Sequence, residues 1–204
     1  MLNQIRKSKV DVRLNTLAAP EYIASLKPDA IIVAIGGEMI KPNIEGIDKC
    51  EHVVQAMKTE CINEGTMVVI GAGAIGAEYA VEKAEENPDL KVVLVDSGDT
   101  VSARENWLYR IAQRQHMNKC DNLKVMLKTN CTRIMDKGVE LETKDGRQFI
   151  KADKVVYSVG MRPKHDEAFS FYGIVPEISY VGDCHRPGHV LDAINDSYFI
   201  AANL

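Results

Sequence analysis

The sequence predicts an α/β protein built around a parallel β-sheet, and three observations support this fold class. Two short runs of aliphatic residues, 66–70 and 91–95, flank a stretch with a helical pattern. Two further runs, 29–36 and 153–160, share one pattern of aspartate, β-branched residues and glycine. Continuous apolar runs of this kind are typical of strands that are buried on both faces of a parallel sheet.

Length, charge and hydropathy narrow the class of protein. The chain has 204 residues, of which 46% are hydrophobic and 26% are charged, and its net charge is −4. This acidic excess disfavours nucleic acid as a partner, because proteins that bind it present a basic face. The longest apolar run, 30–35, is far shorter than the roughly 20 residues that cross a membrane. With no secretory signal at the start, we expect a cytoplasmic protein with no membrane partner.

The cysteines predict neither a disulfide framework nor a metal site. Five cysteines are scattered along the chain, and no two have the C-x-x-C spacing. Cys184, His185 and His189 are the one local group of metal-ligating residue types. Because this group contains a single cysteine and no second cluster accompanies it, we predict no metal ligand.

A glycine-rich turn follows the run 66–70 and precedes the helical pattern over 79–87. The turn consists of Gly71, Gly73, Ala74, Ile75 and Gly76. The next apolar run ends in Asp96, about twenty residues beyond the third glycine. Strand, G-x-G-x-x-G turn, helix, strand and acid follow one another as a dinucleotide-binding fingerprint requires.

Each residue type in this fingerprint has a physical role. Gly71 allows the tight turn, Gly73 lets the backbone approach a pyrophosphate, and Gly76 lets the helix pack close to the strand. The N-terminus of the helix presents N–H groups to the phosphates. Asp96 would accept hydrogen bonds from the adenosine ribose and repel a 2′-phosphate, so we expect NAD(H) rather than NADP(H). A turn that serves packing alone and a methyltransferase cofactor turn are the alternatives, and the third glycine disfavours the second of them.

The segment between Asp96 and the run 153–160 predicts an inserted antiparallel sheet. A helix is expected over 104–117, with Trp107, Ile111 and Gln115 spaced by four, and a strand over 123–127. Alternating runs follow at 132–135, 139–143 and 148–150, joined by glycine-containing turns. One α/β unit with a β-meander therefore extends from about 65 to 160.

The repeated runs predict a second, related unit. Both begin with aspartate and end with glycine, at Gly36 and Gly160. A chance likeness between two buried strands is the alternative, and the shared end residues favour a repeat. A strand over 178–183 ends in Gly182 and Asp183, and a helix is expected over 189–203. An acid at the carboxyl end of a parallel strand lies where ligands bind in such sheets.

The order of four segments, AIIVAIGG, GAGAIGAE, VVYSVGMRP and YVGDCHRPGHVLDAI, resembles that of flavoproteins with two dinucleotide-binding domains. It is most similar to the C-terminal half of the NADH:flavin oxidoreductases, the group of 2,4-dienoyl-CoA and 2-enoate reductases. The resemblance implies that Asp183 binds the FAD ribityl chain or its phosphate and that Ala193 and Ile194 face the flavin pyrimidine. It also implies that Glu78 lies near the nicotinamide. Gly36, Gly160 and Gly182 complete the expected cofactor-binding set.

The chain departs from the family pattern at three places. The first repeated run ends in Ala34-Ile35-Gly36 where the family usually has Ala-Thr-Gly, and Lys164 follows Pro163 where asparagine is frequent. Ser197 stands where a glycine is common. These departures concern details of the flavin site rather than the fold.

The resemblance implies a function as well. Such enzymes pass hydride from NAD(P)H to FAD and electrons onward through an iron–sulfur cluster to FMN in a separate barrel. Hydride transfer needs orientation of the cofactors rather than an acid–base residue, so no catalytic side chain is predicted. The alternative is a non-catalytic nucleotide-binding or interaction module that depends on a partner chain.

The spacing between glycine turn and repeated run places the equivalent turn of the first copy before Met1. We therefore expect this chain to be part of a longer flavoenzyme, with the barrel, its FMN and iron–sulfur cluster, and half of the FAD domain outside it. The expected fold is a Rossmann-like NAD(P)-binding domain with a β-meander insertion, over 61–165. The incomplete remnant of an FAD domain would comprise 1–60 and 166–204, and its exposed edges favour a homodimer.

Overall fold

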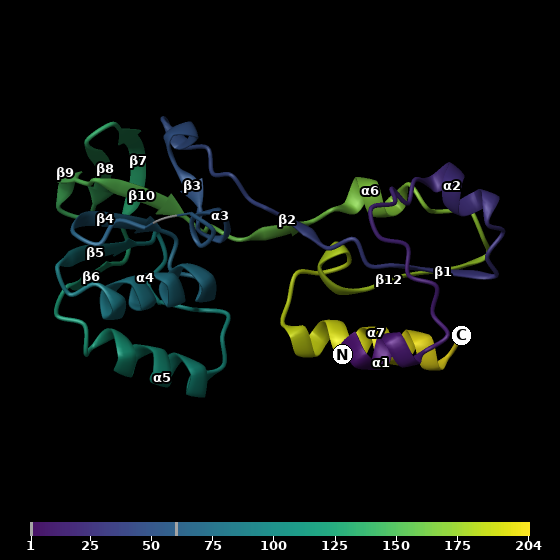
Figure 1. The fold of residues 1–204 in the computed structure, drawn as a ribbon. Helices are drawn as coiled ribbons and strands as arrows, with labels where there is room; N and C mark the ends of the chain where they lie inside the picture. Colours follow the sequence, from purple (N-terminus) through teal and green to yellow (C-terminus); the bar gives the residue numbers. More distant parts are fainter. Residues whose placement is uncertain (1, 60) are drawn as a thin grey trace. The chain divides into compact units, whose positions relative to one another are not determined.

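The computed structural model describes residues 2–59 and 61–204, which form two compact units (Figure 1). Unit 2 is the continuous segment Glu38–Arg162. Unit 1 combines the chain up to Gly37 with the chain from Pro163 onward. The predicted first boundary, at residue 60, therefore differs from the division in the structure. The reason is that strand β3 (Glu51–His52) pairs with a strand of unit 2.

The centre of unit 2 is a five-stranded sheet in which every pairing is parallel. Its strand order is β3-β10-β4-β5-β6. The strands not yet given are β10 (Lys154–Tyr157), β4 (Gly65–Ile70), β5 (Leu90–Val95) and β6 (Leu123–Met126). Because parallel strands require crossover connections, helices α4 (Ala74–Glu86) and α5 (Trp107–Met117) join successive strands. The predicted α/β class is confirmed.

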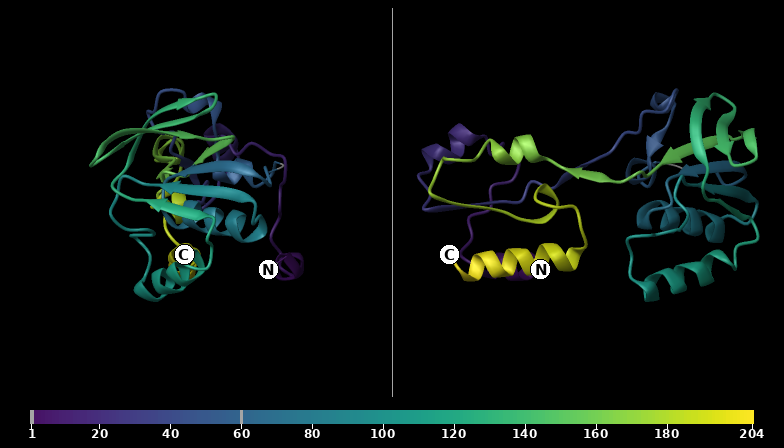
Figure 2. Two further views of the ribbon diagram at one scale, coloured as in Figure 1. Left: turned by 90° about the vertical axis from the view of Figure 1, so that its left-hand side faces the viewer. Right: turned by 180° about the vertical axis from the view of Figure 1, so that it is seen from behind.

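The two faces of this sheet are covered differently (Figures 1 and 2). Alternate strand residues such as Met67 and Val69 pack with the alanines of α4 in one core cluster. Their neighbours Val68 and Ile70 pack in a second cluster with the antiparallel sheet. That sheet consists of β7 (Asn130–Met135), β8 (Gly138–Thr143) and β9 (Gly146–Lys151). The predicted meander is thus confirmed, and it forms a third layer over the parallel sheet.

Helix α5 begins later than its pattern predicts. Asn106 caps it, since its side-chain oxygen accepts a hydrogen bond from the amide of Tyr109 at 2.9 Å. The stripe of Trp107 and Ile111 faces solvent, with 71% and 45% exposure. The buried side chain of this helix is instead polar, Gln113.

Short elements connect the two units and complete unit 2. β2 (Gly37–Met39) pairs with β11 (Met161–Pro163), so the two chain crossings between the units run together. Helix η1 (Ile47–Lys49) and helix α3 (Val53–Ala56) follow β2 and flank β3. Among residues 2–59 and 61–204, no helix is long and apolar enough to cross a membrane.

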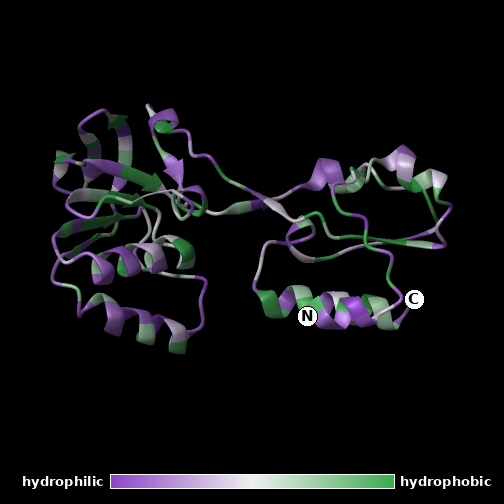
Figure 3. Ribbon diagram, in the orientation of Figure 1, coloured by the Kyte–Doolittle hydropathy of each residue, from purple (hydrophilic) through white to green (hydrophobic). Residues whose placement is uncertain are grey.

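Unit 1 is built on the parallel pair β1 (Ala30–Val33) and β12 (Glu177–Tyr180). Its small core consists of Val33, Ala168, Phe171 and Cys184. The other elements are α1 (Leu2–Lys7), α2 (Pro20–Ser25), α6 (His165–Phe169), η2 (Gly182–Cys184) and α7 (Val190–Ala202). Helix α7 has no buried residue, although it carries large apolar side chains, and its N-terminal end is coloured as hydrophobic in Figure 3. Unit 1 therefore leaves a large apolar surface exposed.

Candidate functional site

A cleft of about 470 Å³ opens at the carboxyl edge of the five-stranded sheet. Three segments line most of it: the glycine turn at 71–73, the loop that follows β5 at 96–104, and residues 158–161 after β10. Parallel α/β sheets bind their ligands at this edge. The cleft therefore brings together Gly71, Gly73, Asp96 and Gly160 from the predicted set.

The three glycines of the turn meet different surroundings. Gly71 has a φ of +105°, and a Cβ there would overlap the carbonyl of Ser158. A Cβ at Gly76 would overlap the carbonyl of Gly71, so the helix could not approach the strand as closely. Gly73 has a φ of −65°, and a Cβ there would meet nothing within 4 Å. The first and third glycines thus serve the fold, whereas the second faces the open cleft.

Helix α4 begins in the cleft without a side-chain cap. Gly73 is its N-cap residue, and among residues 2–59 and 61–204 no side-chain cap bond to the first turn is present. The N–H groups of the first turn, which includes Ala74 and Ile75, therefore carry the positive end of the helix dipole toward the cleft. An uncapped helix N-terminus beside a glycine turn fits a pyrophosphate.

Asp96 joins the two walls of the cleft. Its Oδ2 accepts a hydrogen bond from the amide of Ala72 at 2.6 Å, and its Oδ1 accepts one from the amide of Gly98 at 2.6 Å. A carboxylate oxygen has two lone pairs, so each oxygen retains capacity for a ribose hydroxyl. Asp96 can therefore hold the cleft in shape and bind a sugar at the same time.

The third segment lies on the opposite side of the glycine turn. The amide of Ser158 donates to the carbonyl of Ile70, which continues the pairing of β10 with β4 into the cleft. Gly160 adopts a φ of +112° and its carbonyl accepts from the amide of Ile40. The backbone at Gly160 thus turns away from the sheet into the connection with unit 1.

Glu78 lies outside the cleft lining. Its carboxylate accepts a hydrogen bond from the hydroxyl of Tyr109, across the groove between α4 and α5. Burial, together with this hydrogen bond, raises the pKa of Tyr109. The placement of Glu78 near a nicotinamide, which the family resemblance implies, stays a prediction.

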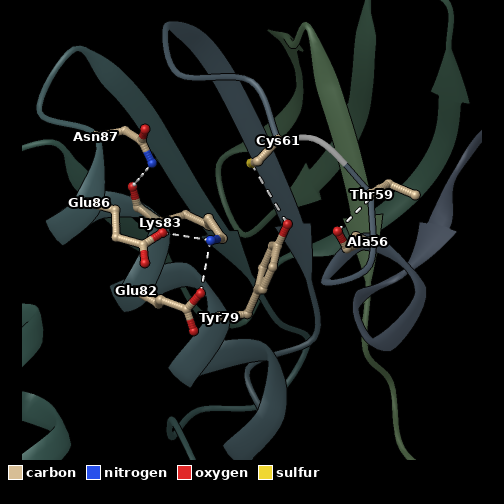
Figure 4. A network of polar contacts seen from close by, with 8 residues as sticks. All are labelled: Ala56, Thr59, Cys61, Tyr79, Glu82, Lys83, Glu86 and Asn87. Atoms are coloured by element: carbon tan, nitrogen blue, oxygen red, sulfur yellow. Dashed lines mark hydrogen bonds and ion pairs between the residues drawn. The ribbon is translucent and has the colours of Figure 1, made fainter.

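A second polar cluster on α4 belongs to packing rather than to the cleft (Figure 4). The hydroxyl of Tyr79 lies 3.9 Å from the sulfur of Cys61, and burial raises the pKa of Tyr79. Lys83 pairs with Glu82 at 2.8 Å and Glu86 at 2.7 Å. None of these residues lines the cleft.

In unit 1, the residues predicted to bind flavin gather where β1 and β12 end. The amide of Val181 donates to the carbonyl of Val33, which places the two strand ends side by side. Gly182 has a φ of +65°, and a Cβ there would lie 3.7 Å from that of Ala193. Asp183 accepts a hydrogen bond from the amide of Gly188 at 3.2 Å. Of the remaining predicted residues, Gly36 follows β1 and Ile194 lies on α7 with its side chain exposed.

A residue of the cleft, Ser102, and its partner Gln113 on α5 escaped prediction from the sequence. Ser102 is buried in the loop after β5, and its hydroxyl donates to Oε1 of Gln113 at 2.6 Å. Its amide donates to the carbonyl of Ala72 in the glycine turn at 2.8 Å. A serine in a loop and a glutamine in a helix carry no signal that would join them, since eleven positions separate them in the chain.

This geometry defines a dinucleotide-binding protein of the α/β class, and comparisons with known proteins agree. The family model of the pyridine nucleotide-disulphide oxidoreductases matches residues 4–196. Bilirubin reductase of Mediterraneibacter gnavus (strain CC55_001C) is 32% identical over 208 residues, which cover 100% of this chain and 32% of that protein. NADH oxidase of Thermoanaerobacter brockii is 30% identical over 210 residues, covering 97% of this chain and 31% of that protein.

A solved structure of 2-naphthoyl-CoA reductase with 2-naphthoyl-CoA superposes with a TM-score of 0.86 at 29% identity. The superposed region covers 100% of this chain and 31% of the 2-naphthoyl-CoA reductase chain. The chain belongs to the pyridine nucleotide-disulphide oxidoreductase family. The resemblance to NADH:flavin oxidoreductases and enoate reductases is confirmed, and membership implies binding of FAD and NAD(P)H. The chain spans about a third of the length of the relatives that it matches.

Proposed function

We propose that unit 2 binds NAD(H) in its cleft and that the chain is the pyridine-nucleotide-binding part of an FAD-dependent oxidoreductase. The observation that carries the proposal is the contrast among the glycines, because Gly73 alone of the three leaves room at the cleft. The pyrophosphate would lie over Gly73 and the uncapped start of α4. Asp96 would accept hydrogen bonds from the adenosine ribose.

The cofactor preference follows from charge. Asp96 would repel a 2′-phosphate, which favours NADH over NADPH. Arg104 is the cation that lines the same cleft, and it is the residue that would oppose this preference. NADH supplies a hydride that FAD accepts when both are bound, and this chain contributes the orientation of the nicotinamide.

The flavin contacts would come from unit 1. Gly182, Asp183 and Ala193 lie together at the end of β12, with Gly36 at the end of the neighbouring strand. In a protein of the relatives' length, we propose that electrons continue through an iron–sulfur cluster and FMN to a reductase barrel. The names of two relatives support the reductase part of this proposal, since bilirubin and 2-naphthoyl-CoA are both unsaturated substrates.

The proposal is tested by NADH titration of the whole chain, followed by nucleotide fluorescence. Gly73→Val places a branched side chain in the open cleft, so NADH binding should be lost while the far-UV circular dichroism stays that of the wild type. Ala24→Val, at an exposed position of α2 in unit 1, is the control for added bulk and should bind NADH as the wild type does. Unchanged affinity of Gly73→Val would place the nucleotide elsewhere.

A partner-dependent module without its own redox activity is the second candidate. The exposure of α7 favours it, because Val190 and Tyr198 are both 77% exposed and large exposed apolar side chains mark surfaces that bind partners. NADH oxidation measured at saturating FAD separates the two candidates, because an excess of free flavin compensates for a weak flavin site in unit 1. Turnover at saturating FAD supports the oxidoreductase, and binding of NADH and FAD without turnover supports the module.

A further inference from the structure

The loop that follows β5 forms one wall of the cleft and is fixed at two points. At its start, the carboxylate of Asp96 accepts from the amide of Gly98, and the carbonyl of Gly98 accepts from the amide of Lys128. Farther along, the amide of Ser102 donates to the carbonyl of Ala72. The second point therefore joins this wall directly to the glycine turn.

Ser102 is an unfavourable residue for the conformation that this second point requires. It is 1% exposed and has a φ of +50°, in the left-handed region where side chains other than glycine, asparagine and aspartate are rare. A strained residue persists only where the surrounding structure holds it in place. The hydrogen bond of the Ser102 side chain identifies the residue that holds this conformation.

Gln113 of α5 supplies that restraint. Its Oε1 accepts a hydrogen bond from the Ser102 hydroxyl at 2.6 Å, and the glutamine is itself 8% exposed. Among the described residues, its Nε2 has no hydrogen-bond partner. The hydrogen bond of this buried amide therefore joins α5 to the loop at Ser102.

We propose that Ser102 and Gln113 are positioning residues that hold the wall of the cleft against the glycine turn before the cofactor binds. This inference rests on the proposed function, because it assumes that the cleft takes a dinucleotide. A wall that is already ordered binds its ligand more tightly, since binding then loses less conformational entropy. The wall follows Asp96, so the effect should fall on the adenosine half of the nucleotide.

Two variants of the whole chain isolate this contact. Ser102→Gly is compatible with the left-handed backbone and the amide bond to Ala72, and it removes the hydroxymethyl side chain that bonds to Gln113. Gln113→Leu removes the acceptor and the unpartnered amide together. Gln115→Leu makes the same change at an exposed position of the same helix and is the matched control.

Dissociation constants are measured for NADH, for ADP-ribose and for reduced nicotinamide mononucleotide, which lacks the adenosine half. We expect each variant to raise the dissociation constants of NADH and ADP-ribose about tenfold. The double variant should raise them no further, because both changes break the same contact. The affinity of Ser102→Gly and Gln113→Leu for reduced nicotinamide mononucleotide should equal that of the wild type. Gln115→Leu should bind all three ligands with wild-type affinity. Circular dichroism and Tm confirm that the variants fold.

Three results would overturn the inference: wild-type affinity for ADP-ribose in both variants, an equal loss of affinity for the mononucleotide, or additive losses in the double variant. A wild-type chain that binds none of the three ligands would instead refute the proposed function itself. The two failures are thus distinguishable in one set of titrations.

Discussion

The carboxylate of Asp96 accepts a hydrogen bond at 2.6 Å from the amide of Ala72, which lies between the first two glycines of the turn. The residue expected to recognise the ribose therefore also fixes the segment expected to hold the pyrophosphate. Hydrogen bonds to a charged acceptor contribute more to stability than neutral ones, at about 1.5–3 kcal/mol. Cofactor recognition and the shape of the cleft are coupled at this residue.

Cofactor preference should show this coupling. We expect the wild-type chain to bind NADH at least tenfold more tightly than NADPH, a difference of about 1.4 kcal/mol. Asp96→Asn should reduce the ratio because it removes the charge that repels a 2′-phosphate, while its remaining oxygen still accepts from one amide. Side-by-side titrations measure both ratios. Arg104→Ala is the companion variant, and a wild-type preference for NADPH that this variant abolishes would assign the dominant role to Arg104.

The glycine turn should respond unequally to alanine. Gly76→Ala forces a methyl group against the carbonyl of Gly71, and we expect a loss of about 2–3 kcal/mol in the free energy of unfolding. At Gly73 an added Cβ would meet nothing within 4 Å, so the free energy of unfolding of Gly73→Ala should lie within about 0.5 kcal/mol of the wild-type value. Urea unfolding followed by circular dichroism compares them. Similar losses in both variants would contradict the division of roles among the glycines.

Asp153 connects the starts of two strands. Its Oδ2 accepts from the amide of Thr66 at 2.9 Å, and its own amide donates to the carbonyl of Thr66 at 2.8 Å. Asp153→Ala leaves the Thr66 amide without this acceptor, so we expect the free energy of unfolding, measured with urea, to fall by about 1–2 kcal/mol. Asp153→Asn keeps a side-chain oxygen, so its free energy of unfolding should lie close to that of the wild type. Equal losses in the two variants would show that the charge, rather than the hydrogen bond, is what stabilises the strand.

His52 makes stability depend on pH. Its Nδ1 accepts from the amide of Val54 at 3.1 Å as the N-cap of α3, and burial lowers the pKa of His52 below its usual 6.5. The folded state therefore disfavours the protonated ring. Its contribution to stability is complete above pH 6.5 and is lost as the pH falls through the lower pKa of the folded state.

Unfolding free energies at pH 7 and pH 5 test this dependence. His52→Asn retains an N-cap acceptor and removes the titration, so its stability should fall less between the two pH values than that of the wild type. His52→Ala removes the cap as well and should be about 1 kcal/mol less stable at pH 7. A fall in His52→Asn as steep as in the wild type would assign the acid sensitivity to other groups.

The flavin site of the isolated chain should be weak. Unit 1 has a pair of strands and a helix, α7, with no buried residue, so the residues predicted to contact FAD have little support. We expect the purified 204-residue chain to be colourless and to self-associate through the apolar side chains of α7. Absorbance at flavin wavelengths and light scattering measure the two effects. Stoichiometric, tightly held FAD would show that unit 1 is complete as a flavin site.

The core of unit 2 was predictable from local patterns. Apolar strand runs, glycine spacing and the acid after β5 are short-range signals, and they placed the parallel sheet, the turn and Asp96 correctly in the fold. The N-terminal limit of unit 2 was harder to predict from the sequence, because β3 is two residues long and joins the sheet through its pairing with β10. The contact between Ser102 and Gln113 also escaped prediction, since a buried polar pair forms through tertiary packing. Trp107 shows the converse, a large apolar residue on a helix that faces solvent.

The paired connections β2 and β11 have a consequence for how the chain folds. Unit 2 is complete once residue 162 has been made, whereas β1 must wait for β12, because Ala30 pairs with Glu177. Pairing between such distant segments carries a high loop-closure entropy when the intervening chain is disordered. Once unit 2 has folded, the pairing of β2 with β11 holds the two ends of the intervening chain close together, so less entropy is lost when β1 pairs with β12. During synthesis, the nucleotide-binding unit would thus act as a template that brings the strands of unit 1 together.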